Sequence, residues 1–345
     1  GAGAGRSRRE HLARATFQNP KDATFMPSQQ PIRIATRSSD LALHQANLVK
    51  VRLEALGEIA ELVTFKTVGD KKLDEPLSAI GAKGLFTKEL EHALGRGKVD
   101  CCVHSLKDLP TESPDGLIVA SVLPRDDPRD VLVIGQVVEA ESLDELPRGS
   151  RVGTSSLRRR AQLAARRKDL DIVELRGNVP TRVRKVDTGV VHAAILAAAG
   201  LHRLGVSQRI TAVLDAPDWL PAPGQGAIAI QLRGDDARMR ELAATLNDTR
   251  TMIDVRAERA FLAALEGGCQ VPIGALVIPR GGKYVLYGLI ADLEGERVVR
   301  GEIALDEHDP ELSGVRLANQ LRSEGATEIL ESLRRAQRLP SPQPE

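Results

Sequence analysis

The chain has 345 residues, and its 48 Lys and Arg nearly balance 47 Asp and Glu, so the formal net charge at pH 7 is +1. This near neutrality and the scarcity of aromatic residues argue against a protein that binds nucleic acid through bulk positive charge and base stacking. No apolar run is long enough to span a bilayer, and the length exceeds that of one hydrophobic core. We therefore expect a soluble protein of two or three domains, with neither nucleic-acid nor membrane partners.

Residues 1–30 are rich in Gly, Arg, Ser and Gln and keep no helical or strand periodicity. We interpret them as a flexible leader, which could be a transit remnant, a cloning remnant or a disordered extension. The expected location is cytoplasmic, or an organelle matrix if the leader is a transit remnant.

Regular structure begins at Pro31 with alternating strand and helix patterns. Gly57 ends the first helix, and Ser38, Ser39 and Asp40 are its candidate N-caps. The expected elements are a strand at 32–36, a helix at 41–56, a strand at 61–68, a helix at 84–94 and a buried strand at 99–106. This alternation predicts a parallel sheet covered by helices on both faces.

A second α/β pattern follows the turn-rich residues 124–130, and a Pro/Gly-rich crossing at 218–232 leads into another strand. From about Thr251 a helix through Leu265, a hairpin around 279–288 and a helix from about Pro310 to Gln337 predict an α+β unit. We assign residues 31–125 and 224–247 to domain 1, 126–223 to domain 2 and 248–345 to domain 3. The fold class is α/β, with two doubly wound domains plus a smaller α+β C-terminal domain.

One of the three cysteines lies in "EGGCQVPIG", residues 266–274. Glycine and proline disfavour helix and central strand there, so we expect Cys269 on a loop, where a thiol is accessible to chemistry. Three cysteines, two of them adjacent at 101 and 102, fit neither a disulfide framework nor a zinc site.

The run "GTSSLRRRAQL", residues 153–163, follows a predicted strand and opens a helix. Thr154, Ser155 or Ser156 can cap this helix, and its first turn offers N–H groups to an anion. Arg158 and Arg159 lie at the positive end of the helix dipole, where a bound anion would be favourable. The alternative is a solvated arginine face, and the sequence leaves the two interpretations about even.

Further arginines stand at the ends of predicted strands, where doubly wound sheets bind their ligands. Arg37 and Arg176 should point into that crevice, and Arg182 and Arg203 lie on nearby segments. Guanidinium groups bind carboxylate or phosphate in a bidentate manner, so the predicted ligand is a polyanion.

The stretch "HSLKDLPT", residues 104–111, leaves an apolar strand and places Ser105, Lys107 and Asp108 at the same kind of strand end. An aspartate among cations stays ionised and can stabilise a developing positive charge. Taken alone, a structural turn aspartate paired with Lys107 is the favoured interpretation, because such ion pairs are common.

Two other patterns carry less weight. "PGQGAIA" satisfies Gly-x-Gly-x-x-Ala, but its glycines precede a strand, whereas dinucleotide binding requires strand, turn and helix in that order. The seven histidines show no metal-ligand spacing, so no metal site is expected.

Taken together, the motifs resemble the porphobilinogen deaminase family. The resemblance runs in order through "IRIATRSSDLALHQ", "VHSLKDLPT", "GTSSLRRRAQL", "LRGNVPTRVRKVD", "GQGAIAI" and "ERAFLAALEGGCQVPIGA". It implies a transferase that condenses four porphobilinogen molecules head to tail into hydroxymethylbilane, with release of ammonia, in tetrapyrrole biosynthesis. It also implies two domains arranged as in periplasmic binding proteins, a monomer, and a mobile lid at residues 69–84.

The resemblance further implies a dipyrromethane cofactor bound by a thioether to Cys269, and Asp108 as the catalytic carboxylate. The implied binders of the acetate and propionate side chains of the cofactor are Ser105, Lys107, Arg37, Ser39, Ser155, Ser156, Arg158, Arg159, Arg176, Arg182, Arg203, Gln225 and Gly226. The implied substrate binders are Arg37, Gln45, Arg158, Arg159, Arg176 and Arg182. The alternative function is a non-catalytic two-domain binding protein for a polycarboxylate; the presence of both Asp108 and Cys269 favours the enzyme.

Overall fold

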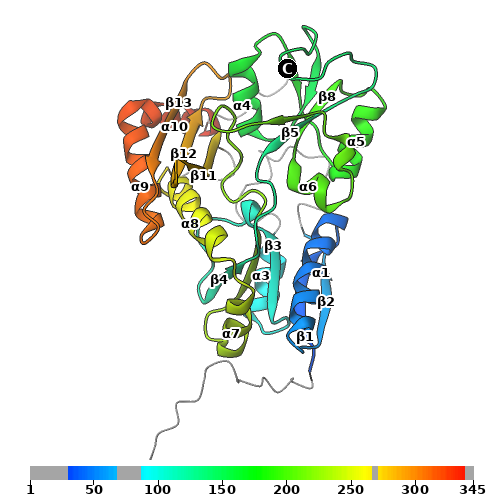
Figure 1. The fold of residues 1–345 in the computed structure, drawn as a ribbon, viewed down its shortest axis with the longest axis vertical. Helices are drawn as coiled ribbons and strands as arrows, with labels where there is room; N and C mark the ends of the chain where they lie inside the picture. The colour runs from blue at the N-terminus through cyan, green and yellow to red at the C-terminus, as the bar shows by residue number, and fades with distance from the viewer. Residues whose placement is uncertain (1–29, 68–86, 266–270, 339–345) are drawn as a thin grey trace, which may run out of the picture.

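The structure is a computed structural model that describes residues 30–67, 87–265 and 271–338. Three β-sheets organise these residues (Figure 1). The predicted leader apart from Gln30, the predicted lid at 69–84 and the loop with Cys269 lie outside the described residues.

The first sheet has five strands in the order β2-β1-β3-β10-β4. Three helices pack on it, because its strands alternate buried side chains between the two faces. Ile34 and Ile230 belong to the cluster that packs against α1 and α7, whereas Ala35 belongs to the cluster around α3. The elements are β1 (Ile32–Arg37), α1 (Asp40–Ala55), β2 (Ala60–Phe65), α3 (Lys88–Gly95), β3 (Cys101–Ser105), β4 (Leu117–Val122), β10 (Ile228–Arg233) and α7 (Ala237–Leu246).

The second sheet repeats this arrangement with the order β7-β6-β8-β5-β9. Leu132 and Ile195 pack with Leu163 of α4 on one face, while Val131 and Leu196 face the cluster of α5 and α6. The elements are β5 (Asp130–Ile134), β6 (Arg151–Gly153), α4 (Leu157–Arg166), β7 (Asp171–Val173), α5 (Val179–Asp187), β8 (Ala193–Ala197), α6 (Ala198–Arg203) and β9 (Ala212–Leu214).

Both sheets are mixed, so the prediction of parallel sheets was wrong in this respect. β1 pairs in parallel with β2 and β3, but β10 runs antiparallel to β3 and β4. In the second sheet β5 runs antiparallel to β8 and β9 in the same way. The reason is that each reversed strand enters its sheet directly from the other α/β unit.

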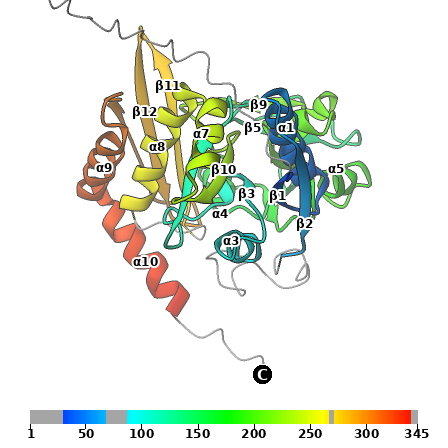
Figure 2. The same ribbon diagram turned by 90° about the horizontal axis from the view of Figure 1, so that it is seen from below.

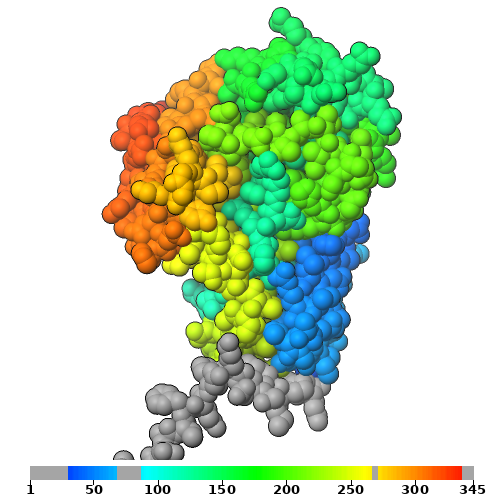
Figure 3. Space-filling model, viewed as in Figure 1, coloured from blue at the N-terminus to red at the C-terminus, as the bar shows by residue number. Residues whose placement is uncertain are grey.

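Two crossing segments join these units. Residues 123–129, the first crossing segment, connect β4 to β5, and residues 215–227, the second crossing segment, connect β9 to β10. The predicted return of the chain to the first unit after Gly224 is therefore observed in the strand order. The space-filling view shows the second unit seated on the first (Figure 3). The exact domain boundaries stay a prediction.

The third unit is a three-stranded antiparallel sheet, β11-β12-β13, packed against helices. Phe261 of α8 and Leu317 of α9 lie in one buried cluster with Leu286 of β12. Helix α8, which overlaps β12 in the view of Figure 2, contacts both β11 of this sheet and β4 of the first unit. The elements are α8 (Thr249–Ala264), β11 (Ile273–Arg280), β12 (Lys283–Ala291), β13 (Val298–Ala304), α9 (Pro310–Leu321) and α10 (Thr327–Arg338). The predicted fold class, two α/β units plus a smaller α+β unit, is confirmed.

The C-terminal helix predicted from about Pro310 to Gln337 is interrupted. A π-turn at Arg322–Ala326 separates α9 from α10, and Gly325 has a φ of 113°. A positive φ is cheap only for glycine, so this single residue allows the break that periodicity alone did not reveal.

Candidate active site

The turn after β3 carries the predicted catalytic residue. Leu106–Asp108 form one 3-10 turn, whose first N–H donates to the carbonyl of Ala227 at 3.0 Å. Leu106 is buried, whereas Asp108 is exposed. At the start of this turn Ser105 exchanges hydrogen bonds with the side-chain amide of Gln45 on α1, at 2.9 and 3.1 Å. The first unit thus holds the backbone of the turn and leaves the Asp108 carboxylate available.

Lys107 links the turn to the second crossing segment, because its Nζ donates to Gln225 Oε1 at 3.2 Å. Burial lowers the pKa of Lys107 to about 8, and the nearby cations Arg159 and Arg158 lower it further against the opposing effect of Asp108 and Asp130. In the unfolded chain Lys107 has the ordinary lysine pKa of 10.5, so between pH 8 and 10.5 the unfolded chain binds more protons than the folded protein. The contribution of Lys107 to the free energy of unfolding therefore increases as pH rises through that range.

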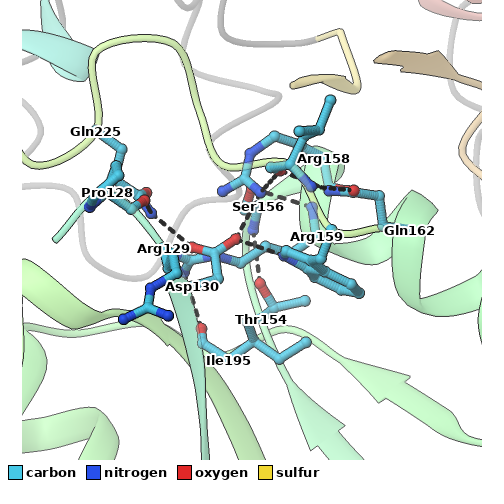
Figure 4. A network of polar contacts seen from close by, with 12 residues as sticks. Pro128, Arg129, Asp130, Thr154, Ser156, Arg158, Arg159, Gln162, Ile195 and Gln225 are labelled. Carbon is cyan, nitrogen blue, oxygen red and sulfur yellow. Dashed lines mark hydrogen bonds and ion pairs between the residues drawn. The ribbon is translucent and has the colours of Figure 1, made fainter. Parts of the chain in front are cut away.

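Asp130, the first residue of β5, is a buried carboxylate that collects five hydrogen bonds (Figure 4). Its Oδ2 accepts from Arg158 Nη1 at 2.6 Å and from Trp219 Nε1 at 2.8 Å. Its Oδ1 accepts from Arg159 Nη2 at 2.7 Å, from Arg159 Nε at 3.1 Å and from Gln225 Nε2 at 2.8 Å. Burial alone would raise the pKa of Asp130, but the two arginines outweigh it and hold the pKa well below its usual range.

Arg158 and Arg159 do not form the solvated face that the sequence left open, because each is only 5% exposed. Besides Asp130, Arg158 donates to the carbonyl of Leu220 at 2.8 Å and Arg159 to that of Ile195 at 2.9 Å. One carboxylate thus orients two guanidinium groups and leaves the pair with a net positive charge. Of the two, Arg159 lines the small cavity described below.

Arg182 on α5 completes the cationic group. Burial lowers its pKa to about 10, with Arg159 and Arg176 lowering it further and Asp108 opposing. Lys107, Arg159 and Arg182 line one small cavity, and Asp108 lies within electrostatic reach of Lys107 and Arg182. An anionic ligand would relieve this repulsion.

Arg203 and Gly226 lie beside this group, where α6 meets both crossing segments. Arg203 Nη2 donates to the carbonyl of Gly226 at 2.5 Å, and its Nε is 3.4 Å from Asp126 Oδ2. Gly226 has a φ of 87°, and a Cβ there would lie 2.5 Å from the carbonyl oxygen of Asp126. Only glycine therefore fits this contact between the two crossing segments.

A small cavity of about 80 Å³ lies among these side chains. Its polar lining consists of Gln45, Ser105, Lys107, Arg159, Arg182, Arg203 and Gln225. This is the volume of a few water molecules and far below that of a usual ligand pocket, so a large ligand requires movement of the units or side chains.

A larger cavity of about 360 Å³ lies beside the first crossing segment and is lined by His44, Arg52, Arg125 and His202 among others. Arg125 there is already paired in bidentate fashion with Glu258, at 2.7 and 2.9 Å. Arg203 there also lies beside Asp126, so the smaller cavity, whose lining among the described residues contains cations and no carboxylate, is the candidate anion site.

The remaining predicted residues that the structure describes line neither cavity. Ser39 and Ser156 are the N-caps of α1 and α4, and Ser155 donates to the carbonyl of Leu175 at 2.7 Å. Arg37 lies near enough to His104 to lower its pKa. Arg176 Nε lies 3.5 Å from Glu174, and Cys269 lies outside the described residues.

Sequence analysis missed Asp130, Trp219 and the Arg125–Glu258 pair. Asp130 stands at the end of "PRDDPRD", which we interpreted only as a turn. A carboxylate directly before the apolar run "VLVIG" was the available signal, because a buried charge needs a partner and "LRRR" supplies one. Glu258 and Trp219 offered no comparable pattern.

The described residues contain no cluster of three or more His, Cys, Asp or Glu that could hold a metal ion. No helix among them combines the length and apolar character required to cross a bilayer.

Between the two α/β units, cations line a small cavity and the Asp108 carboxylate is exposed, an arrangement typical of proteins that bind polycarboxylates. Two family models match this chain: porphobilinogen deaminase, dipyromethane cofactor binding domain, over residues 32–241, and porphobilinogen deaminase, C-terminal domain, over residues 252–323. A curated relative named porphobilinogen deaminase, from Syntrophobacter fumaroxidans, is 48% identical over 307 residues, which cover 88% of this chain and 98% of that protein. This chain belongs to the porphobilinogen deaminase family.

Similar solved structures include periplasmic binding proteins. The methionine binding protein MetQ covers 68% of this chain and 94% of its own at 18% identity, with a TM-score of 0.40. A nutrient binding protein from Burkholderia cenocepacia bound to methionine covers 62% and 90% at 15% identity, also with a TM-score of 0.40. These scores are low, so the description of the fold depends on the strand orders given above.

Asp130→Asn tests whether this carboxylate neutralises the arginine pair. Asparagine keeps the shape but leaves two buried guanidinium groups without a counter-ion, so we expect the free energy of unfolding to fall by about 3–5 kcal/mol. Urea unfolding followed by circular dichroism measures the loss.

Glu58→Gln is the matched control, since it makes the same chemical change at a buried carboxylate paired with an arginine. Its partner Arg238 is 39% exposed and can turn to water, so a loss of about 1 kcal/mol or less is expected. Equal losses in the two variants would contradict the role of Asp130.

Proposed function

We propose that the cleft around Lys107 and Arg182 binds the carboxylate side chains of a dipyrromethane primer, with Asp108 as the catalytic carboxylate and Cys269 as the covalent anchor. The chain is a transferase of tetrapyrrole biosynthesis, a hydroxymethylbilane synthase, and its cofactor is dipyrromethane. It condenses four porphobilinogen molecules head to tail and releases one ammonia at each step. Membership of this family does not favour a non-catalytic binding protein.

The observation that carries the site assignment is the crowding of cations beside Asp108. Lys107 and Arg182 both have their pKa lowered by burial and by neighbouring arginines. Each pyrrole of the substrate class carries an acetate and a propionate, so a chain of pyrroles supplies the missing negative charges. Arg203, which also lines the cavity, is proposed on the same grounds, and the other binders predicted from the sequence, including Arg37 and Arg176, are proposed from the family resemblance.

Asp108 acts where positive charge develops. When porphobilinogen loses ammonia, the C–N bond electrons leave with the nitrogen, and the remaining cation is delocalised onto the pyrrole nitrogen. An exposed carboxylate next to that nitrogen stabilises the cation and can hold the proton released when the new C–C bond forms. When bound, the cofactor supplies the terminal α-carbon that attacks.

The cysteines favour Cys269 as the anchor. Burial raises the pKa of Cys101 to about 12 and raises that of Cys102 well above its usual value, so neither supplies a thiolate. Of the three cysteines in the chain, this leaves Cys269.

We also propose that the protein works as a cytoplasmic monomer without nucleic-acid or membrane partners. One chain carries Asp108, the arginines and Cys269, so a second copy is not needed to complete the site. The net charge of +1 offers no general attraction for nucleic acid.

Intact mass spectrometry tests the anchor. Protein from a host that makes porphobilinogen should carry an adduct of two linked pyrrole units, which is absent in Cys269→Ser because the thioether cannot form. Cys101→Ala, at a buried thiol, should retain the adduct. An adduct that persists in Cys269→Ser would refute the assignment.

Asp108→Ala tests the catalytic carboxylate. We expect kcat to fall by roughly 100-fold or more, because charge stabilisation at the reacting nitrogen is lost. Hydroxymethylbilane formation is measured in protein that still carries the adduct. Asp115→Ala, at an exposed aspartate a short distance along the chain, should leave kcat unchanged. Near-normal turnover in Asp108→Ala would exclude the proposed role.

The pH dependence of binding tests Lys107. Because its pKa is about 8, its charge is present below that pH and is lost as pH rises through it. The apparent KM for porphobilinogen should therefore rise above pH 8, by up to roughly tenfold per pH unit. Lys107→Gln should have a high KM at pH 7 and lack this rise, whereas Lys168→Gln, at an exposed lysine, should behave like the parent. If KM rises equally above pH 8 in the parent, Lys107→Gln and Lys168→Gln, the titrating group is not Lys107.

A further inference from the structure

Arg259 of α8 extends from the third unit to the turn that carries Asp108. Its Nη2 donates to the carbonyls of Pro110 at 2.6 Å and Thr111 at 3.3 Å, and its Nη1 donates to that of Leu109 at 3.2 Å. Three consecutive carbonyls directly after Asp108 are thus held by one guanidinium group.

The same face of α8 packs against this turn. Val255, one helical turn before Arg259, lies in a buried cluster with Leu106 and Leu109, and Met252 packs against that cluster. The arginine therefore projects from a helix that already contacts the turn through apolar side chains.

The neighbouring residue on α8, Glu258, fixes the helix to both crossing segments. Its carboxylate is fully buried, pairs with Arg125 and accepts from the backbone N–H of Gly224 at 2.7 Å. It also accepts from the N–H of Val277 in β11 at 3.1 Å. The helix from which Arg259 projects is thus anchored in the third unit and at both crossing segments.

The opposite side of the turn is held by the second crossing segment. Leu106 N–H donates to Ala227, and Lys107 donates to Gln225. Both flanks of Asp108 in the chain are therefore restrained, one by the second crossing segment and the other by Arg259.

The chemistry of Arg259 argues for more than packing. Burial lowers its pKa, and among the described residues no carboxylate lies within ion-pair distance of it. Arg259 is partly buried, and a cation withdrawn from water with only carbonyls as partners is costly compared with an apolar side chain of similar volume. The planar fork of arginine, unlike a lysine ammonium, spans several fixed acceptors at once.

We propose that Arg259 is a positioning residue that sets the Asp108 turn relative to α8. This inference depends on the roles proposed above for Asp108 and Cys269. Leu265 follows α8 directly and precedes residues 266–270, so the helix that holds the Asp108 turn also leads into the proposed cofactor anchor. Arg259 thereby links the position of the catalytic carboxylate to the start of the anchor segment.

The test compares Arg259→Lys and Arg259→Met in the full chain with its cofactor. A lysine keeps the positive charge but lacks the fork, so both variants should lose roughly 10- to 100-fold in kcat per adduct-bearing molecule, as expected for a small misplacement of a catalytic group. The apparent KM should stay within about twofold, because Arg259 does not contact substrate. Intact mass measures the adduct, and thermal melting measures the folded fraction.

Arg256→Met is the matched control, since Arg256 lies on the same helix in an exposed pair with Glu311 and should have no effect on kcat. Full kcat in Arg259→Met, or restoration by lysine alone, would overturn the proposal. If Arg259→Met does not fold, the kcat of Arg259→Lys alone tests the proposal, and a normal kcat in that variant overturns it. Asp108→Ala is measured alongside: normal turnover there refutes the catalytic assignment itself, whereas slow turnover there with normal Arg259→Lys refutes only the positioning role.

Discussion

The cleft depends on one buried negative charge. Asp130 is fully enclosed, yet its pKa is held well below its usual range because it neutralises Arg158 and Arg159. Without it, two guanidinium groups would be buried at the start of α4 with only carbonyls as partners. With it, the pair is fixed in orientation and still carries a net positive charge. A protein whose overall charge is only +1 thereby concentrates positive charge at one place.

This arrangement separates two kinds of cation. Arg158 and Arg159 are oriented by the protein itself, whereas Lys107 and Arg182 keep a lowered pKa because burial and like charge are not compensated. A ligand that brings several carboxylates therefore gains most from the second kind. The exposed Asp108 remains available for chemistry, since the surrounding restraints act on its neighbours and not on its carboxylate.

The fold class and the polar residues that line the small cavity were predictable from the sequence. The direction of two strands and the long-range partners of the buried carboxylates were not. Local signals such as Ser39, Ser156 and Gly57 identify the ends of elements, because caps and positive-φ glycines act within a few residues. The reversed strands β5 and β10 were missed because strand direction depends on where the chain returns in space. Asp130 and Glu258 escaped for a similar reason: their partners are 28 and 133 residues away in the chain. The family resemblance identified the candidate catalytic and binding residues, but not the buried carboxylates that orient their neighbours.

The place of β10 has a consequence for how the protein is made. The second sheet is built from one continuous stretch, β5 to β9, but the first sheet has β10 between β3 and β4. During synthesis from the N-terminus, the chain from β1 to β4 therefore lacks an interior strand until residue 233 has emerged. The unit that is translated first is thus completed only after the second unit, and nascent chains that stop before that residue expose unpaired strand edges.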